Sequence, residues 1–124
     1  MPTFNHVNLG TPVGGREAMG TWLVEIIGLR PVSVSGAMAR LDVRWFEADD
    51  GMQVHLSEDP DHRPAQRAHV AVDFGDQLDT VAQRLRAAGT EYTTGSNPEL
   101  AVLNCCDPAG NRWELRGQLS SPDA

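Results

Sequence analysis

One order of predicted elements occurs twice along this chain, and that repeat limits the possible folds more than any other feature. Each half begins with a strand-like run, continues with an amphipathic helix and ends with three more strand-like runs. In the first half these elements are expected at 4–9, 15–27, 31–35, 40–47 and 52–57. In the second half they are expected at 69–74, 77–88, 91–94, 101–106 and 112–117. Each half is therefore predicted to be one β-α-β-β-β module.

The two modules, 4–57 and 69–117, are joined by a charged and proline-containing linker at 58–68. A module of roughly sixty residues buries too little surface to be stable by itself. With 124 residues and 40% apolar residues, the whole chain has enough material for one core. We therefore expect a single α+β domain over 1–124, with Asp76 capping the second helix.

Charge and composition exclude several function classes. The net charge of −7 argues against binding to nucleic acid or to an anionic membrane surface. All ten basic residues are arginine, so a Schiff-base lysine and a P-loop lysine are both excluded. No stretch is apolar enough to span a membrane, and the first residues show no secretion signal. Two adjacent cysteines cannot form a disulfide framework, so we expect a cytoplasmic protein.

Four side chains that commonly bind metals occupy equivalent places in the two modules. His6 begins the first strand of the first module, and His69 begins that of the second module, 63 residues later. His55 and Glu114 lie in the last strands, 49 and 45 residues after the histidine of their own module. An isolated histidine or glutamate on a strand is usually only solvated, but four at repeat-related positions indicate a shared role.

The alternation of side chains along a strand places these four residues on one face of each predicted sheet. In every case the candidate ligand points away from the bulky apolar residues of its strand, which are Val7, Leu9, Val54, Leu56, Val70, Val72, Phe74, Trp113 and Leu115. We expect the apolar faces to pack against the helices. The ligands are then free to converge on the opposite face.

Other residues share the predicted ligand face. Candidates for substrate contact are Asn8, Gln53, Arg112 and Arg116, although solvated or structural roles are at least as common for such residues. Trp45 is open to either a core or a substrate role. His62 lies in the linker without periodic support, and we expect it to be solvent-exposed. Cys105 and Cys106 lie in a strand without a basic neighbour and are not expected to act as nucleophiles.

Five motifs give the chain a resemblance to a known superfamily. They are HVNL from His6, WLVEIIGLR from Trp22, RWFEADDGMQVHLSED from Arg44, HVAV from His69 and DPAGNRWEL from Asp107. In these motifs the chain resembles the vicinal oxygen chelate superfamily of glyoxalases, extradiol dioxygenases, methylmalonyl-CoA epimerases and bleomycin- or fosfomycin-resistance proteins. The resemblance implies paired βαβββ modules forming a cupped sheet around a divalent metal, usually in a homodimer. It places the metal positions at His6, His55, His69 and Glu114.

The departures from the family pattern concern the substrate. Relatives with glyoxalase I activity tend to have Glu or Gln at the position of His55. They also tend to have Arg four residues after the first ligand, where this chain has Gly10. This weakens the expectation of a glutathione conjugate as substrate. Drug-sequestering relatives typically lack the metal ligands, which this chain keeps.

Three neutral imidazoles and one carboxylate suit Zn, Ni, Co, Fe or Mn without selecting among them. The predicted function is a glyoxalase-like lyase or isomerase that binds a small substrate through neighbouring oxygens and stabilises an enediolate or enolate. Resemblance to glyoxalase suggests Glu114 as the general base, and Asp73, which shares the parity of His69, is a second candidate.

The sequence leaves two alternative functions open. An extradiol ring-cleaving dioxygenase needs three open metal positions, and it becomes possible if His55 does not bind the metal. A binding protein that sequesters a small molecule or an antibiotic would use the same cup without a metal.

Overall fold

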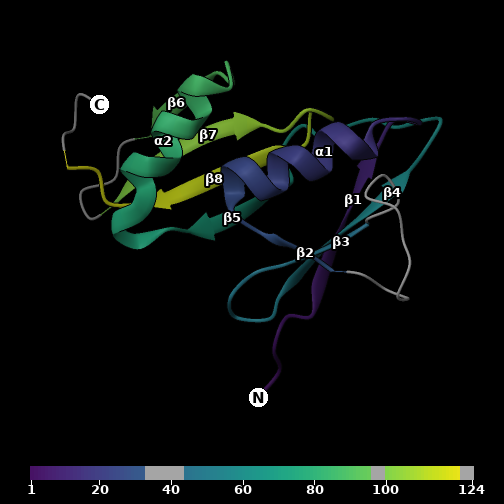
Figure 1. Cartoon of the computed structure of the whole chain (residues 1–124), viewed down its shortest axis with the longest axis horizontal. Helices are drawn as coiled ribbons and strands as arrows, with labels where there is room; N and C mark the ends of the chain where they lie inside the picture. Colours follow the sequence, from purple (N-terminus) through teal and green to yellow (C-terminus); the bar gives the residue numbers. More distant parts are fainter. Residues whose placement is uncertain (33–43, 96–99, 121–124) are drawn as a thin grey trace. The chain divides into compact units, whose positions relative to one another are not determined.

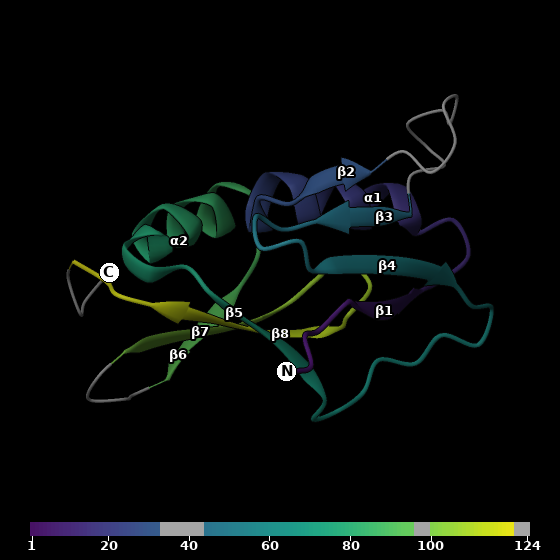
Figure 2. The same ribbon diagram turned by 90° about the horizontal axis from the view of Figure 1, so that it is seen from below.

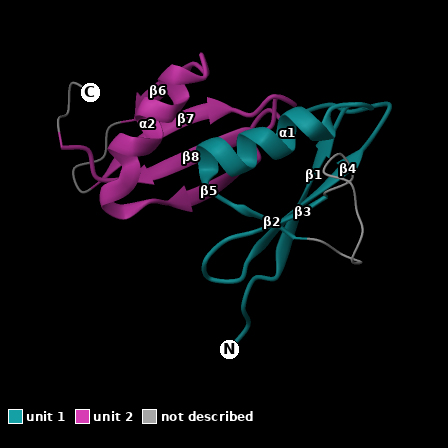
Figure 3. Ribbon diagram, in the orientation of Figure 1, with its two compact units in different colours: residues 1–64 teal, residues 65–124 magenta. Residues whose placement is uncertain are grey.

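The chain forms two compact units, 1–64 and 65–124, each with its own sheet and helix (Figure 3). The structure is a computed structural model that describes residues 1–32, 44–95 and 100–120. None of the described helices is long and apolar enough to cross a membrane.

Unit 1 is a four-stranded mixed sheet with a helical segment (Figure 1, Figure 2). Its strands are β1 (His6–Thr11), β2 (Arg30–Val32), β3 (Trp45–Glu47) and β4 (Gln53–Glu58), in the order β1-β4-β3-β2. β1 runs parallel to β4, and the other neighbours are antiparallel. The helix α1 (Arg16–Trp22) continues as a π-helical turn η1 (Leu23–Ile27) and ends at Gly28, whose φ of 91° allows a left-handed cap.

Unit 2 repeats this topology in its own strands. They are β5 (His69–Asp73), β6 (Tyr92–Gly95), β7 (Ala101–Cys106) and β8 (Arg112–Gly117), in the order β5-β8-β7-β6. β5 runs parallel to β8, as β1 does to β4. A 3-10 turn η3 (Gly75–Gln77) leads into α2 (Leu78–Ala87), which covers one side of this sheet (Figure 1). The predicted α+β class and β-α-β-β-β order are confirmed in both units.

Element ends differ from the prediction in identifiable places. The stretches 33–35 and 40–43 of two expected strands lie outside the described residues. The expected cap at Asp76 is wrong, because that residue lies in η3 and α2 begins after Gln77 without a side-chain cap bond. Asp76 is part of the 3-10 turn and is therefore not the residue that precedes the first turn of α2.

Burial alternates along the strands as predicted. In β4, Val54 and Leu56 are buried while Gln53 and His55 are half-buried. In β8, Trp113 and Leu115 are buried while Glu114 is half-buried. The apolar helix residues complete each core, and they are Met19, Trp22, Leu23, Ile26 and Ile27 in unit 1 and Leu78, Val81, Ala82 and Leu85 in unit 2.

A buried carboxylate organises the turn between β7 and β8. Oδ1 of Asp107 accepts hydrogen bonds from the backbone N–H groups of Ala109 and Asn111, at 2.9 and 3.0 Å. Its Oδ2 accepts the indole N–H of Trp113 at 2.9 Å. Asp107 is only 5% exposed, so these bonds satisfy a charge that would otherwise be costly to bury. They fix the start of β8, and with it the register of Glu114.

Replacing Asp107 by Ala should therefore destabilise the protein. The substitution leaves the buried indole N–H of Trp113 without its acceptor, which costs about 1–3 kcal/mol in the free energy of unfolding. Urea denaturation measures this loss. The matched control is Asp50→Ala, which removes a similar bond to the N–H of Met52 in an exposed turn and should cost less than about 1 kcal/mol. Equal losses in the two variants would contradict the role given to Asp107.

An ion pair ties the end of β4 to the start of α1. Nε of Arg16 donates to Oε1 of Glu58 at 3.0 Å. This hydrogen bond is the main reason that the pKa of Glu58 lies below its ordinary value of 4.5. A lowered carboxylate pKa contributes stability above the unfolded pKa, and that stability is lost as the pH falls through the folded pKa.

Glu58→Gln should thus lower the free energy of unfolding at pH 7, and the difference from the wild type should shrink as the pH falls below 4.5. Thermal or urea unfolding across pH 3 to 7 measures the difference. In an Arg16→Gln background the substitution should lose most of its pH-dependent effect, because the donor has been removed. If the difference in the free energy of unfolding stayed unchanged down to pH 3, the lowered pKa of Glu58 would not be its cause.

Candidate metal centre and adjoining pocket

The two predicted ligands of unit 1 lie against each other. His6 of β1 and His55 of β4 stack with ring centroids 4.0 Å apart and an interplanar angle of 14°. Trp45 of β3 stacks on His55 at 4.5 Å and 9°. The register explains this stack. Trp45 of β3 and Asn8 of β1 are the residues opposite His55 on its two neighbouring strands. His6 lies two residues before Asn8 and therefore on the same face of β1.

A chain of hydrogen bonds fixes which nitrogen of His55 carries its proton. Nε2 of Gln53 donates to Oε1 of Glu47 at 3.3 Å, so the amide oxygen of Gln53 points the other way. That oxygen lies 2.8 Å from Nε2 of His55 and accepts its N–H. The neutral ring then has its lone pair on Nδ1. Glu47, which sequence analysis did not select, thus sets the tautomer of His55 through Gln53.

Each imidazole of unit 1 has a feature that suits a metal ligand. Burial, and then the positive charge of protonated His6, lower the pKa of His55 below its ordinary value of 6.5. Nδ1 of His6 lies 2.7 Å from the side-chain oxygen of Asn5 and donates to it, which leaves Nε2 with the lone pair. A carbonyl that accepts one ring N–H while the other nitrogen stays open is the usual support of a metal-binding histidine.

The two predicted ligands of unit 2 also face each other. Nδ1 of His69 donates to the backbone carbonyl of Arg67 at 2.9 Å. A carbonyl oxygen accepts only, so the lone pair of the neutral ring is on Nε2. That atom lies 3.8 Å from Oε2 of Glu114. Two acceptors therefore point at one another, and a cation between them, or a proton on Nε2, removes their repulsion.

These donor sets fit a divalent metal in their chemistry. Two atoms bound to one ion at about 2.0–2.2 Å lie roughly 3 to 4 Å apart, which includes the separation of His69 and Glu114. Among the residues that the structure describes, however, no three His, Cys, Asp or Glu side chains form a group that could hold a metal ion. Each unit brings two of the four predicted ligands together.

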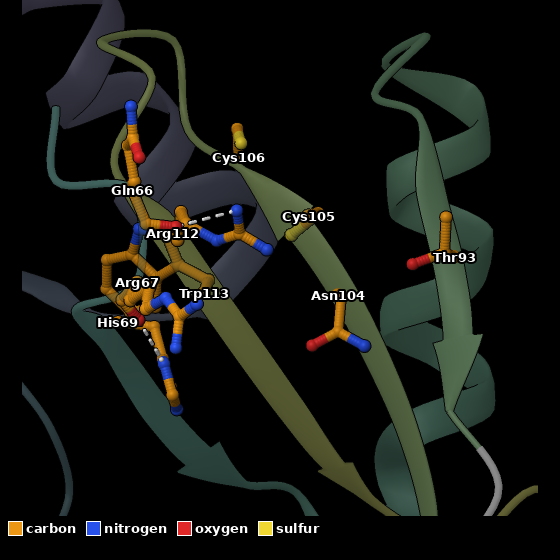
Figure 4. A pocket seen from close by; sticks show the side chains of 9 residues that line it. All are labelled: Gln66, Arg67, His69, Thr93, Asn104, Cys105, Cys106, Arg112 and Trp113. Atoms are coloured by element: carbon orange, nitrogen blue, oxygen red, sulfur yellow. Dashed lines mark hydrogen bonds between the residues drawn. The ribbon is translucent and has the colours of Figure 1, made fainter.

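A pocket of about 470 Å³ opens beside His69 within unit 2. It is lined by Gln66, Arg67, His69, Thr93, Asn104, Cys105, Cys106, Arg112 and Trp113. Figure 4 shows Gln66, Arg67, His69 and Arg112 gathered at one end, with Asn104 and Thr93 further along. Of the predicted substrate contacts, Arg112 is in this lining. Asn104 was missed, although it faces Glu114 in the register between β7 and β8 and shares its parity.

The remaining predicted residues take other partners. Asn8 accepts a hydrogen bond from the hydroxyl of Ser57 at 3.0 Å. Asp73, the second candidate base, lies 3.7 Å from Nε of Arg116, which is opposite it in the register of β5 and β8. Trp45 is 36% exposed, and its indole covers His55.

The linker histidine is not the exposed residue that the sequence suggested. His62 is half-buried, and a side-chain carbon added at Gly10 would lie 2.9 Å from its Nδ1. The glycine therefore makes room for the ring of His62 on the face of β1 that also presents His6 and Asn8. Residues of the linker show no apolar periodicity, so the sequence could not predict that His62 lies against Gly10.

Comparison with known proteins places these observations in a family. The family model described as Glyoxalase/Bleomycin resistance protein/Dioxygenase superfamily matches residues 3–115. No curated protein matches the chain.

Solved structures share the fold. A protein described as of the glyoxalase family, from Bacillus anthracis, is 26% identical with a TM-score of 0.77, and the match covers 96% of this chain and 97% of that one. A glyoxalase/dioxygenase from Nostoc punctiforme is 20% identical with a TM-score of 0.76, covering 95% and 92%. The fosfomycin resistance protein FosX from Listeria monocytogenes is 15% identical with a TM-score of 0.75, covering 97% and 96%. At these identities the last two show the fold alone.

The two cysteines should differ sharply in reactivity. Burial, followed by the neighbouring Cys106 and Asp107, raises the pKa of the Cys105 thiol to about 12, whereas Cys106 is exposed. At pH 8 a disulfide reagent such as DTNB should label one thiol of the native protein and both thiols in urea. Cys106→Ser should abolish the native reaction. Rapid labelling of that variant would show that Cys105 is accessible.

Proposed function

This chain belongs to the glyoxalase, bleomycin resistance protein and dioxygenase superfamily, and we propose that it is a divalent-metal-dependent lyase or isomerase. Its metal ligands are His6, His55, His69 and Glu114. Two come from each unit, and they meet either within one chain or across a homodimer. The substrate is a small molecule with two neighbouring oxygens.

One observation supports this proposal above the others. The carbonyl of Arg67 fixes the proton of His69 on Nδ1, so Nε2 and a carboxylate oxygen of Glu114 face each other as two acceptors. A divalent cation would satisfy both, since imidazole and carboxylate are ordinary ligands of Zn, Ni, Co, Fe and Mn.

The roles of the chain's own residues follow from their contacts. When bound, the metal supplies a Lewis acid that polarises the substrate oxygens and acidifies the adjacent C–H. We assign the role of proton acceptor to Glu114, because among the residues that the structure describes His69 alone lies within ion-pair distance of its carboxylate. Asp73 is the weaker candidate, since its carboxylate already has an ion-pair partner in Arg116, 3.7 Å away.

Coordination by His55 separates this proposal from the dioxygenase alternative. An octahedral ion held by these four protein ligands would keep two open positions, enough for a chelating substrate. Ring cleavage requires a third position for O₂. The lone pair of His55 on Nδ1 and its lowered pKa support its inclusion among the ligands.

The experiment that tests the function begins with elemental analysis of the purified protein. The metal-free protein is then reconstituted with each candidate metal and assayed against α-ketoaldehyde–thiol adducts, acyl-CoA epimers and catechols. Turnover of one of the first two classes, dependent on added metal, supports the proposal. Turnover of catechols alone supports the dioxygenase. A protein that binds no metal but binds small apolar molecules supports sequestration.

We also propose a cytoplasmic homodimer. The family resemblance and the two unpaired cysteines support this assignment. Light scattering at micromolar concentration should give twice the mass of the chain, and a monomer would contradict it.

His55→Ala should weaken metal affinity by more than about tenfold, because it removes a ligand and not merely a supporting contact. Isothermal titration of the metal-free protein with Zn²⁺ measures this change, and circular dichroism checks that the variant is folded. His62→Ala is the matched control, since it removes an imidazole of the same unit outside the ligand set. Unchanged affinity in His55→Ala would leave three ligands and favour the dioxygenase.

A further inference from the structure

The pocket of unit 2 has a charge opposite to that of the chain. The sequence has 17 acidic and 10 basic residues, for a net charge of −7. Yet the pocket lining contains two arginines and a histidine, and no carboxylate. An excess of positive charge in a concave site of an acidic protein favours entry of an anion.

The two arginines belong to one hydrogen-bonded arrangement. Arg112 of β8 donates from Nη1 to the backbone carbonyl of Gln66 at 3.0 Å. His69 of β5 donates to the carbonyl of the next residue, Arg67. These bonds tie the segment before β5 to the sheet at two successive residues. Figure 4 shows the side chain of Arg67 at the same end of the pocket as that of Arg112.

We propose that Arg67 and Arg112 bind an oxyanionic group, a carboxylate or a phosphate, carried by the substrate. A guanidinium presents a planar fork of N–H donors that matches both groups. Arg112 uses one nitrogen for the carbonyl of Gln66 and keeps further donors.

Neutral donors extend the same pocket. Asn104 of β7 and Thr93 of β6 are opposite each other in the register and line the pocket beyond the arginines. His69 lies at the arginine end. The anion would therefore lie near a proposed metal ligand, and the remainder of the substrate would extend along Asn104 and Thr93. As a statement about the substrate this inference rests on the proposed function, but binding of the anion requires no metal.

The test uses the full chain freed of metal with EDTA and then dialysed. Inorganic phosphate and acetate are titrated in parallel at constant ionic strength, with sodium chloride as the ionic control. Binding is followed in ¹H–¹⁵N spectra through the backbone signals of the lining residues and the Nε–H signals of the arginines. We expect saturable shifts of the pocket signals with phosphate, acetate or both, and none with chloride.

Arg67→Gln should weaken anion affinity by about tenfold or more, because a hydrogen bond to a charged group is lost. Arg112→Gln should do the same, and Arg112→Lys should restore only part of the affinity, because an ammonium lacks the fork. The control is Arg84→Gln, which removes the same charge from α2 and should leave the affinity unchanged. Arg67 lies outside the strands, so Arg67→Gln should still fold and still measure anion affinity if Arg112→Gln is unstable.

Two results would overturn the inference. One is the absence of saturable shifts with either anion. The other is an equal loss in Arg84→Gln and Arg67→Gln, which would mean that only net charge matters. Elemental analysis and zinc titration test the metal proposal separately. If that proposal fails, the anion titration remains valid, because it uses protein without metal.

Discussion

The parallel pairing of the first and last strands of each unit determines where every candidate ligand lies. β1 lies beside β4, and β5 beside β8, so the two ligands of each unit are on adjacent strands. Asn8 is opposite His55, and Ala71 is opposite Glu114, each two residues after a histidine that begins its strand. A slip of one residue in either pair would turn a ligand toward the apolar face. Backbone hydrogen bonds and core packing thus fix the positions of the candidate ligands within each unit.

The alternating pattern of apolar residues made this part of the structure predictable. The bounds of β7 and β8 agree with those expected from the sequence, and a glycine with positive φ follows each helical segment, Gly28 directly after η1 and Gly89 one residue beyond the end cap of α2. Parity placed His55 and Glu114 on the less buried faces of their strands, as the structure confirms. Side chains alternate between the two faces of a strand, so the order of apolar and polar residues in one sequence is enough to predict which face each residue occupies.

Features that depend on aperiodic segments were not predictable. Arg67 and His62 lie in the linker, where no periodicity relates a residue to a face. The protonated nitrogen of His55 depends on Glu47 acting through Gln53, a relation between strands that requires the register. Gly10 marked a departure from the family pattern, but only the structure shows that the ring of His62 occupies the space above it.

The two units have the same topology but different site chemistry. Unit 1 presents two stacked imidazoles under an indole, a set without a formal charge when both rings are neutral. Unit 2 presents an imidazole and a carboxylate beside two arginines.

This division matters for the proposed reaction. A carboxylate that accepts a proton must lie near the anionic part of the substrate without repelling it. In unit 2 the two arginines offset that repulsion in the pocket next to His69. In the proposed site, unit 1 would contribute two imidazoles without adding charge, so a divalent ion held by all four candidate ligands would keep a net charge of about +1 for stabilising an anion formed in the reaction.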